Sequence, residues 1–175
     1  MTVGHEIARR TGFRLFHNHQ TIDLILRFFP FGSPAFNRLG GEFRTRIFEE
    51  VAGSELPGLI FTYVWDYKNP AELEYIERMA GIFRKRGGQV AIAELEASQT
   101  ERLRRNETEF RLAEKPSKRD VAASRRNLLE LDTGHQLNSK GIYDHRPDYF
   151  RLETTQLSVA QTADRIIQRF SLPLV

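Results

Sequence analysis

The chain has 175 residues, which is the size of one domain rather than two. Hydrophobic residues make up 40% of it and charged residues 28%, a composition that excludes a disordered or fibrous protein. It contains no Cys, so disulfide frameworks, thiolate zinc sites and cysteine catalysis are excluded. No run approaches the ~18 apolar residues of a membrane span, and no signal-peptide pattern follows Met1. We therefore expect a soluble, cytoplasmic protein without a membrane partner.

The small positive charge of the chain is concentrated in one segment. Lys and Arg number 26 against 23 Asp and Glu, a net charge of +3. Residues 101–126 hold nine basic and five acidic side chains, so this segment carries about +4 and the rest of the chain about −1. A basic segment in a nearly neutral domain predicts one site for an anionic ligand rather than a surface that wraps nucleic acid.

Helices and strands are expected to alternate along the chain. The expected order is helix 2–11, strand 13–16, helix 22–29, helix 34–47, strand 59–65, helix 70–86, strand 90–95, the basic segment, strand 149–153 and helix 159–170. Gly12 is expected to end the first helix, and residues 69–72, 98–101 and 158–161 have the pattern of capping boxes. The pair Gly40-Gly41 weakens the third helix, whereas residues 59–65 are apolar on both faces, as is typical of a buried parallel strand.

This alternation predicts an α/β fold with a mostly parallel sheet that is flanked by helices on both faces. In such sheets ligands bind at the carboxyl ends of the strands. The first predicted helix has no strand before it, although phosphates commonly bind in the first strand-to-helix turn.

The sequence of that first helix resembles a known family. Residues 1–12 are similar to the first helix of small P-loop kinases of the shikimate-kinase, gluconate-kinase and adenylate-kinase type. Residues 16–24, 29–34, 59–64 and 153–158 resemble a shikimate-kinase-like subgroup that is also described as AAA-like ATPases. The resemblance implies a single domain, residues 1–175, with the three-layer fold of P-loop nucleotide kinases and with residues 101–148 as a lid-like basic segment and loop.

The sequence departs from this family at its phosphate-binding motif. The family's G-x-x-x-x-G-K-[ST] loop surrounds phosphates with backbone N–H groups at a helix N-terminus, and neither its glycines nor its lysine is present here. We expect that the native start lies upstream and supplies a strand and this loop. The alternative is a truncated protein that lacks its central strand.

The resemblance also implies residues that bind the nucleotide. Arg105 is expected near the nucleotide, and Arg111, Lys115 and Arg119 are expected to close over the phosphates during transfer. Thr2 would lie near the phosphates, and backbone groups of the loop formed by Thr154, Thr155 and Gln156 would contact adenine. For each basic residue the alternative is a solvated position on an amphipathic helix.

The predicted strand 13–16 ends in residues suited to an acceptor site. His17, Asn18 and His19 are expected to bind the acceptor. Asp23, one turn into the next helix, is expected to accept a hydrogen bond from the acceptor hydroxyl or to act as its general base. Two alternatives remain for the triplet. His17 and His19 could share a metal, for which no third ligand is evident, or Asn18 could cap the helix. The chain shows no metal-binding hairpin of an HNH nuclease.

Asp66 follows the most apolar strand, where a carboxylate could bind Mg²⁺ directly or through water. The alternative is that Asp66 forms a turn.

With ATP and Mg²⁺ as implied cofactors, the expected function is an ATP-dependent phosphotransferase acting on a hydroxyl of a metabolite. The alternative is a non-catalytic remnant that binds a partner or anion through its basic segment. Nucleic-acid binding is disfavoured, because Phe110 is the only aromatic residue in that segment.

Overall fold

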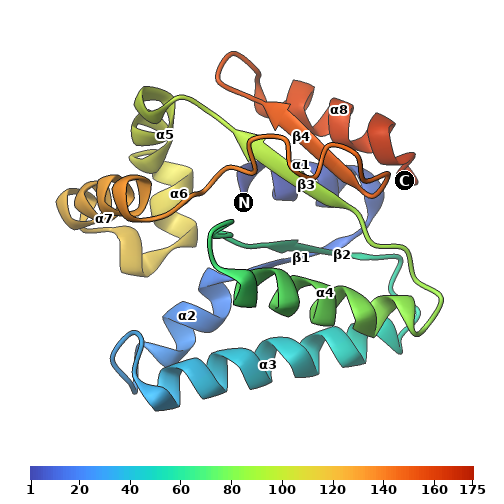
Figure 1. Ribbon diagram of the computed structural model, residues 1–175, viewed down its shortest axis with the longest axis horizontal. Coiled ribbons are helices and arrows are strands. Elements are labelled where there is room, and N and C mark those ends of the chain that lie inside the picture. The colour runs from blue at the N-terminus through green and yellow to red at the C-terminus, as the bar shows by residue number, and fades with distance from the viewer.

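Four short parallel strands form two separate pairs. The computed structural model describes all residues from Met1 to Val175. Strand β1 (Arg14–His17) pairs with β2 (Leu59–Thr62), and β3 (Ile92–Glu96) pairs with β4 (Tyr149–Glu153). All four strands run in the same direction, so their carboxyl ends lie at one side of the molecule (Figure 1). The predicted α/β fold with parallel strands and flanking helices is confirmed.

Eight α-helices and one short 3-10 helix accompany the strands. They are α1 (Thr2–Thr11), α2 (His19–Ile25), α3 (Pro34–Ala52), α4 (Pro70–Arg84), α5 (Gln99–Asn106), α6 (Glu109–Glu114), η1 (Pro116–Lys118), α7 (Val121–Gly134) and α8 (Val159–Phe170). None of them combines the length and the continuous apolar character that crossing a bilayer requires.

Helices α1 and α8 pack together and join the two strand pairs on one face. Ile7 of α1 belongs to a buried cluster with Ala163 and Ile167 of α8. Ile60 of β2 and Phe150 of β4 pack against the same cluster, so each strand pair contributes to it. Apolar burial at this cluster therefore fixes the position of α1 relative to all four strands.

Helices α3 and α4 cover the opposite face of β1 and β2. Phe16 of β1, Phe48 of α3 and Met79 of α4 form a second buried cluster. The ring centroids of Phe16 and Phe48 are 6.0 Å apart in an edge-to-face arrangement, which is a favoured geometry for aromatic pairs. The cluster leaves the carboxyl ends of β1 and β2 free for polar residues.

The single sheet that the sequence predicts is not continuous. Strands β2 and β3 each pair on one side only, and no ladder joins them. Although its residues are apolar on both faces, β2 is only partly buried, and Val64 just beyond it is 55% exposed. Leu95 in β3 is 42% exposed. Apolar strands with an unpaired edge are incompletely covered, which explains the difference from the predicted buried strand.

Local signals in the sequence position several helix ends. Gly12 ends α1 with φ 71°, and Ser158 with Gln161 forms a reciprocal capping box at α8. Ser98 caps α5 through its hydroxyl, but the expected reciprocal bond is absent because the Glu101 carboxylate accepts hydrogen bonds from arginines instead. Asn69 likewise caps α4 by its side chain alone.

Helix α3 continues through Gly40-Gly41, where the sequence predicts a weak point. Gly40 is buried, and a Cβ added to it would lie 3.7 Å from the Ile25 side chain. This distance is an ordinary van der Waals contact, so the packing of α2 on α3, rather than a need for glycine, keeps the helix continuous despite the low helix propensity of Gly40.

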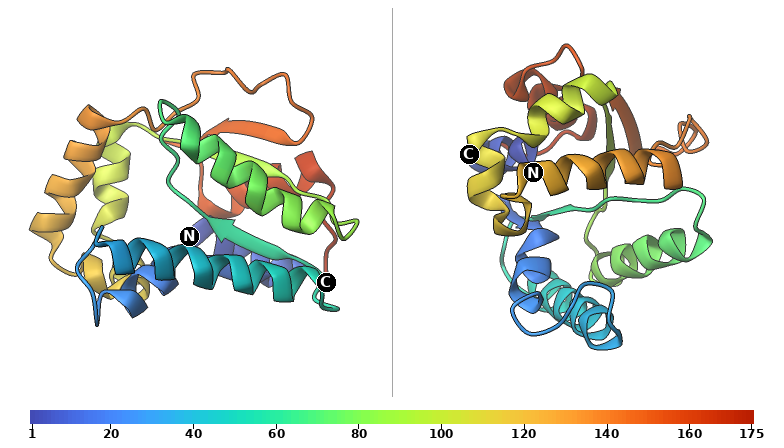
Figure 2. Two further views of the ribbon diagram at one scale, coloured as in Figure 1. Left: turned by 60° about the horizontal axis from the view of Figure 1, so that its bottom comes forward. Right: turned by 90° about the vertical axis from the view of Figure 1, so that its left-hand side faces the viewer.

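The basic segment forms a helical unit of α5, α6, η1 and α7. It leaves the sheet after β3 and returns to β4 through residues 135–148. The unit lies at the side where the strands end (Figures 1 and 2), next to the N-terminus of α1. The expected position of the lid-like segment is therefore compatible with the fold.

Candidate anion-binding site

The N-terminus of α1 lies at the carboxyl ends of the strands (Figure 1). Its first helical residue is Thr2, and the N-cap position, Met1, provides no capping side chain. The first turn contains no acidic residue. The first N–H groups of a helix have no intrahelical partners, so this end of α1 presents free donors and the positive end of the helix dipole.

Three basic side chains from α6 and its following turn gather at this helix end. Arg111 and Lys118 are partly buried, Lys115 is only 8% exposed, and none of the three forms an ion pair with a carboxylate. Burial, followed by the nearby charges of Arg111 and Lys118, lowers the pKa of Lys115 to about 8. Burial also lowers the pKa of Arg111 and of Lys118. We call these three residues the cation cluster.

Two members of the cation cluster, Arg111 and Lys115, lie near the N-terminus of α1. Burial and the charges of Lys115 and Arg111 lower the pKa of the Met1 amino group to about 5. The Nε atom of Arg111 is buried without a hydrogen-bond partner. Lys118 donates to the side chain of Asn127 at 2.9 Å, which holds it against α7. An anion-binding site is typically built from such groups: cations with unused hydrogen-bond donors beside a helix N-terminus.

The end of β1 brings two buried histidines to the same place. His17 is 3% exposed, and burial, with Lys115 the next cause, lowers its pKa. His19 is 8% exposed, and burial with the charge of Lys115 lowers its pKa to about 4. Both imidazoles are therefore neutral at pH 7, and each can donate a hydrogen bond from one ring nitrogen and accept one at the other. The Nδ1 atom of His17 is buried without a partner.

Asp23 completes the site from α2. Its Oδ1 lies 3.5 Å from Nδ1 of His19 but is buried without a hydrogen bond. Its charge also acts on Lys115 and Lys118. The predicted grouping of His17, His19 and Asp23 is thus observed at one position. Asn18 does not cap α2 with its side chain, and its backbone carbonyl accepts a hydrogen bond from the Thr21 hydroxyl.

Two residues that the sequence reasoning missed connect the basic segment to the body of the protein. Glu114 Oε2 lies 3.3 Å from His5 Nε2 and 3.5 Å from His17 Nε2. The His5 ring also packs edge-to-face on Phe110 of α6, with centroids 5.1 Å apart. His5 lies on α1 one turn after its start, and its polar neighbours in sequence gave no signal of this contact. Glu114 holds α6 over the strand ends.

Of the lid arginines predicted to contact phosphates, Arg119 does not join the cation cluster. It is exposed, and its Nε donates to the Leu112 carbonyl at 3.2 Å. Lys118, which the sequence did not predict, belongs to the cation cluster instead. The cause is η1, because the 3-10 turn that begins at Pro116 changes the direction of the side chains after Lys115.

The predicted nucleotide residues around Arg105 also lie together, but they bind one another. Arg105 donates to the Thr154 hydroxyl at 3.0 Å and to its carbonyl at 2.7 Å, and to Glu101 at 2.7 Å. The Thr155 hydroxyl accepts the backbone N–H of Ser98 at 2.8 Å. This network ties α5 to the end of β4. Gln156 is exposed beside it.

Asp66 stands in a turn rather than in an acidic cluster. Its Oδ2 lies 2.7 Å from His135 Nδ1, and its Oδ1 accepts the backbone N–H groups of Lys68 and Gln136, each at 3.1 Å. The hydrogen bond to His135 is the main cause that lowers the pKa of Asp66. No three or more His, Cys, Asp or Glu residues are grouped to hold a metal ion.

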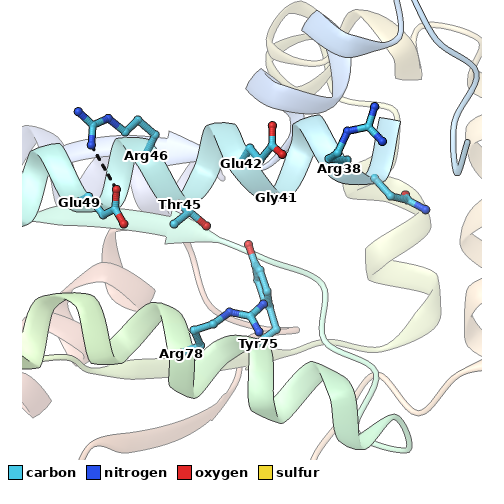
Figure 3. A pocket seen from close by; sticks show the side chains of 9 residues that line it. Arg38, Gly41, Glu42, Thr45, Arg46, Glu49, Tyr75 and Arg78 are labelled. Atoms are coloured by element: carbon cyan, nitrogen blue, oxygen red, sulfur yellow. Dashed lines mark hydrogen bonds and ion pairs between the residues drawn. The ribbon is translucent and has the colours of Figure 1, made fainter. Parts of the chain in front are cut away.

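A groove between α3 and α4 lies apart from this site (Figure 3). Charged residues dominate its lining, and Arg46 pairs there with Glu49 at 3.4 Å, while the Tyr75 ring lies beneath the guanidinium of Arg78. Because the charged side chains of its lining are exposed to water, the groove lacks the buried cations of the cation cluster.

Comparison with known proteins supports the fold. No protein-family model matches the chain, and no curated protein matches it. Among solved structures, the tunicamycin resistance protein of Deinococcus radiodurans is similar, with a TM-score of 0.52 and 18% sequence identity. The similarity covers 100% of this chain and 93% of the other. At this level of identity the likeness is one of fold.

Proposed function

We propose that this chain carries the phosphoryl-transfer site of a P-loop-type small-molecule kinase, in which ATP donates its γ-phosphoryl group to a hydroxyl of a metabolite. The supporting observation is the cation cluster, whose members Arg111, Lys115 and Lys118 are partly or fully buried and form no ion pair with a carboxylate. Arg111 and Lys115 lie near the N-terminus of α1. Burial of cations without an ion-paired carboxylate costs free energy. A polyphosphate would offset that cost and would bind the free N–H groups of α1.

The acceptor side of this proposal rests on Asp23 and the two histidines. Asp23 takes the proton of the acceptor hydroxyl, the hydroxyl oxygen bonds to the γ-phosphorus, and the bond between phosphorus and the ADP oxygen breaks. The buried Oδ1 of Asp23 and Nδ1 of His17, both without partners, supply the hydrogen-bonding capacity that an acceptor would use. The cation cluster stabilises the negative charge on the transferred group.

Asp66 does not fit a direct magnesium ligand in this arrangement. Both its oxygens hold hydrogen bonds, to His135, Lys68 and Gln136, and no second carboxylate is grouped with it. No step of the proposed transfer is assigned to a metal bound by Asp66. Magnesium would arrive with ATP, whose phosphate oxygens are its usual ligands in kinases.

The proposal also accounts for the two strand pairs. We propose that the active protein has one further parallel strand between β2 and β3, followed by a glycine-rich loop that enters α1. This strand would complete the three-layer fold of P-loop nucleotide kinases and cover Val64 and Leu95, which are exposed beside the unpaired edges. The loop would provide the Gly and Lys residues of the missing phosphate motif.

The test compares the 175-residue chain with a chain extended by the upstream in-frame codons. We expect the extended chain to bind ATP and to transfer phosphate to an acceptor in a metabolite screen, and Lys115→Met to weaken both. Arg126→Gln, an exposed arginine of the same basic segment, is the matched control and should have no effect. Absence of ATP binding in both chains, or a stop codon before any glycine-rich loop, would refute the kinase proposal.

A second candidate function is a non-catalytic protein that binds an anion or a partner through the basic segment. The observation in its favour is that Arg105, Thr154 and Thr155, the predicted nucleotide residues, already satisfy one another or neighbouring backbone groups. It predicts that ATP leaves the melting temperature of the extended chain unchanged, whereas inorganic pyrophosphate raises it.

A further inference from the structure

An exposed group of apolar side chains surrounds the turn between α2 and α3. Phe28 and Phe31 are each 72% exposed, more than any other Phe of the chain, and Phe29 is 38% exposed. Leu24 and Leu26 at the end of α2 are also exposed. We call these five residues the aromatic tip. Exposed apolar groups of this kind on a folded domain mark an interaction surface.

The backbone holds the aromatic tip in a defined turn. Gly32 adopts φ 76°, which favours glycine, and Ser33 caps α3 through its hydroxyl. Phe36 is buried and packs on Phe31 with ring centroids 4.9 Å apart. The turn therefore cannot withdraw its aromatic side chains into the core without unpacking α3. It lies at the periphery of the molecule in each view (Figures 1 and 2).

The chain segment of the aromatic tip carries only positive charges. Between Asp23 and Glu42 no Asp or Glu occurs, and the segment contains Arg27 and Arg38. Both arginines are exposed, and neither forms an ion pair. A second copy of the chain would bring these arginines together, so self-association through this surface is disfavoured. A small molecule would need a concave site, whereas these side chains protrude.

We propose that the aromatic tip docks on an anionic lipid bilayer. Phenylalanine side chains would enter the boundary between headgroups and acyl chains, while Arg27 and Arg38 would contact the negative headgroups. Such docking is peripheral and needs no membrane-spanning helix. It differs from the sequence-based expectation of no membrane partner, which depended on the absence of an apolar span and of a signal-peptide pattern.

The test is co-sedimentation of the chain with vesicles. One set contains equal parts phosphatidylglycerol and phosphatidylcholine, and the other contains phosphatidylcholine alone. We expect binding to the anionic vesicles that weakens between about 0.05 and about 0.5 M salt, since salt screens surface charge. The double variant Phe28→Ser, Phe31→Ser should reduce the partition coefficient by about tenfold or more. Arg27→Gln with Arg38→Gln should reduce both binding and its salt dependence.

Two matched variants keep the test specific. Ile142→Ser removes another exposed apolar side chain, and Arg86→Gln another exposed arginine without an ion pair, and both should bind the vesicles like the original chain. Unchanged melting temperatures would show that the variants fold.

Equal binding by the phenylalanine variant and the original chain, or no binding to anionic vesicles at low salt, would overturn the proposal. Concentration-dependent self-association that this variant abolishes would overturn it in favour of a second copy. None of these outcomes depends on kinase activity.

Discussion

The environment of Lys115 is that of a ligand-binding residue rather than that of a solvated surface lysine. It is nearly buried, has no carboxylate partner and lies beside two other cations, so its charged form is disfavoured in the folded protein. A lysine that served only to solubilise α6 would extend its ammonium group into water. The unfavourable position is explained if an anion occupies the site during function.

This position has a consequence for stability that depends on pH. The pKa of Lys115 is about 8 in the folded protein and 10.5 ordinarily, so between these values the unfolded chain binds more protons. The free energy of unfolding therefore rises with pH from about 8 to about 10, and below pH 8 the full cost of the buried charge remains. We expect Lys115→Met to remove this rise and to stabilise the chain at pH 7 by on the order of 2 kcal/mol.

Urea unfolding at several pH values measures this effect as the difference between the two chains. The comparison with the original chain is needed because burial raises the pKa of Tyr63, Tyr67 and Tyr149. These tyrosines lower the free energy of unfolding above about pH 10 in both chains, and the difference between the chains removes their effect. Lys140→Met, an exposed lysine, is the control and should leave the pH profile unchanged. A Lys115→Met profile parallel to that of the original chain would show that Lys115 is solvated.

At the residue scale, sequence reasoning identified part of the site. The basic segment pointed to Arg111 and Lys115, and the polar end of strand 13–16 pointed to His17, His19 and Asp23, all of which lie together. It could not distinguish Lys118 from Arg119, because the choice depends on the 3-10 turn after Lys115. Glu114 and His5 were missed because their contact joins residues 109 positions apart.

At the scale of elements, helix α6 is held over the strand ends by Glu114 and Phe110. Glu114 lies close to His5 of α1 and His17 of β1, and the Phe110 ring packs edge-to-face on His5. The helix has only six residues and contains no buried residue in its apolar positions. Short helices are marginal without tertiary contacts, so this link controls the local stability of α6.

We expect Glu114→Gln to increase hydrogen exchange of the α6 amides by about tenfold, which corresponds to about 1.4 kcal/mol of local opening. Glu109→Gln, an exposed glutamate of the same helix without an ion pair, should leave exchange unchanged. Mass spectrometry of peptides covering residues 107–119 measures both. Similar protection in all three chains would mean that α6 does not depend on Glu114.

The end of α1 depends on a glycine. Because Gly12 has φ 71° and a Cβ there would lie 3.3 Å from Val175, we expect Gly12→Ala to destabilise the chain by about 1–2 kcal/mol. Gly81 in α4 has free space around it, so Gly81→Ala should instead stabilise by about 0.5–1 kcal/mol. Thermal unfolding checks the two signs. Destabilisation by both substitutions would contradict the reasoning from backbone conformation.

The sequence predicted the elements well where the signals were local. Gly12 and Ser158 mark helix ends through their own conformation or side chain, and both are observed. Strand ends were less accurate: the strand predicted over 59–65 ends at Thr62, because its partner β1 ends opposite at His17 and the chain there turns into α2. Pairing between strands is set by distant segments, and no local pattern reports it.

At the scale of the whole molecule, the main departure from a continuous parallel sheet is the interruption between β2 and β3. Helices α1 and α8 hold the two strand pairs together through Ile7, Ala163 and Ile167 rather than through a continuous ladder of hydrogen bonds. The unpaired edges of β2 and β3 are open to another strand.

The proposed additional strand makes a prediction about these edges. In the chain extended upstream, amides of both β2 and β3 should exchange more slowly than in the 175-residue chain, because a strand between them would pair with each. Amides of β1, which lies on the other side of β2, serve as the internal control. Protection of only one of the two edges would be inconsistent with insertion between the pairs.

The central claim is that the cation cluster at the N-terminus of α1 binds phosphate groups, and calorimetric titration with inorganic pyrophosphate tests it most directly. We predict binding by the 175-residue chain, with proton uptake at about pH 8.5, because the anion raises the depressed pKa of Lys115. Lys115→Met should weaken binding by about tenfold or more and abolish the proton uptake, whereas Arg126→Gln should change neither. Equal affinity in all three chains, or no binding in any of them, would contradict the claim.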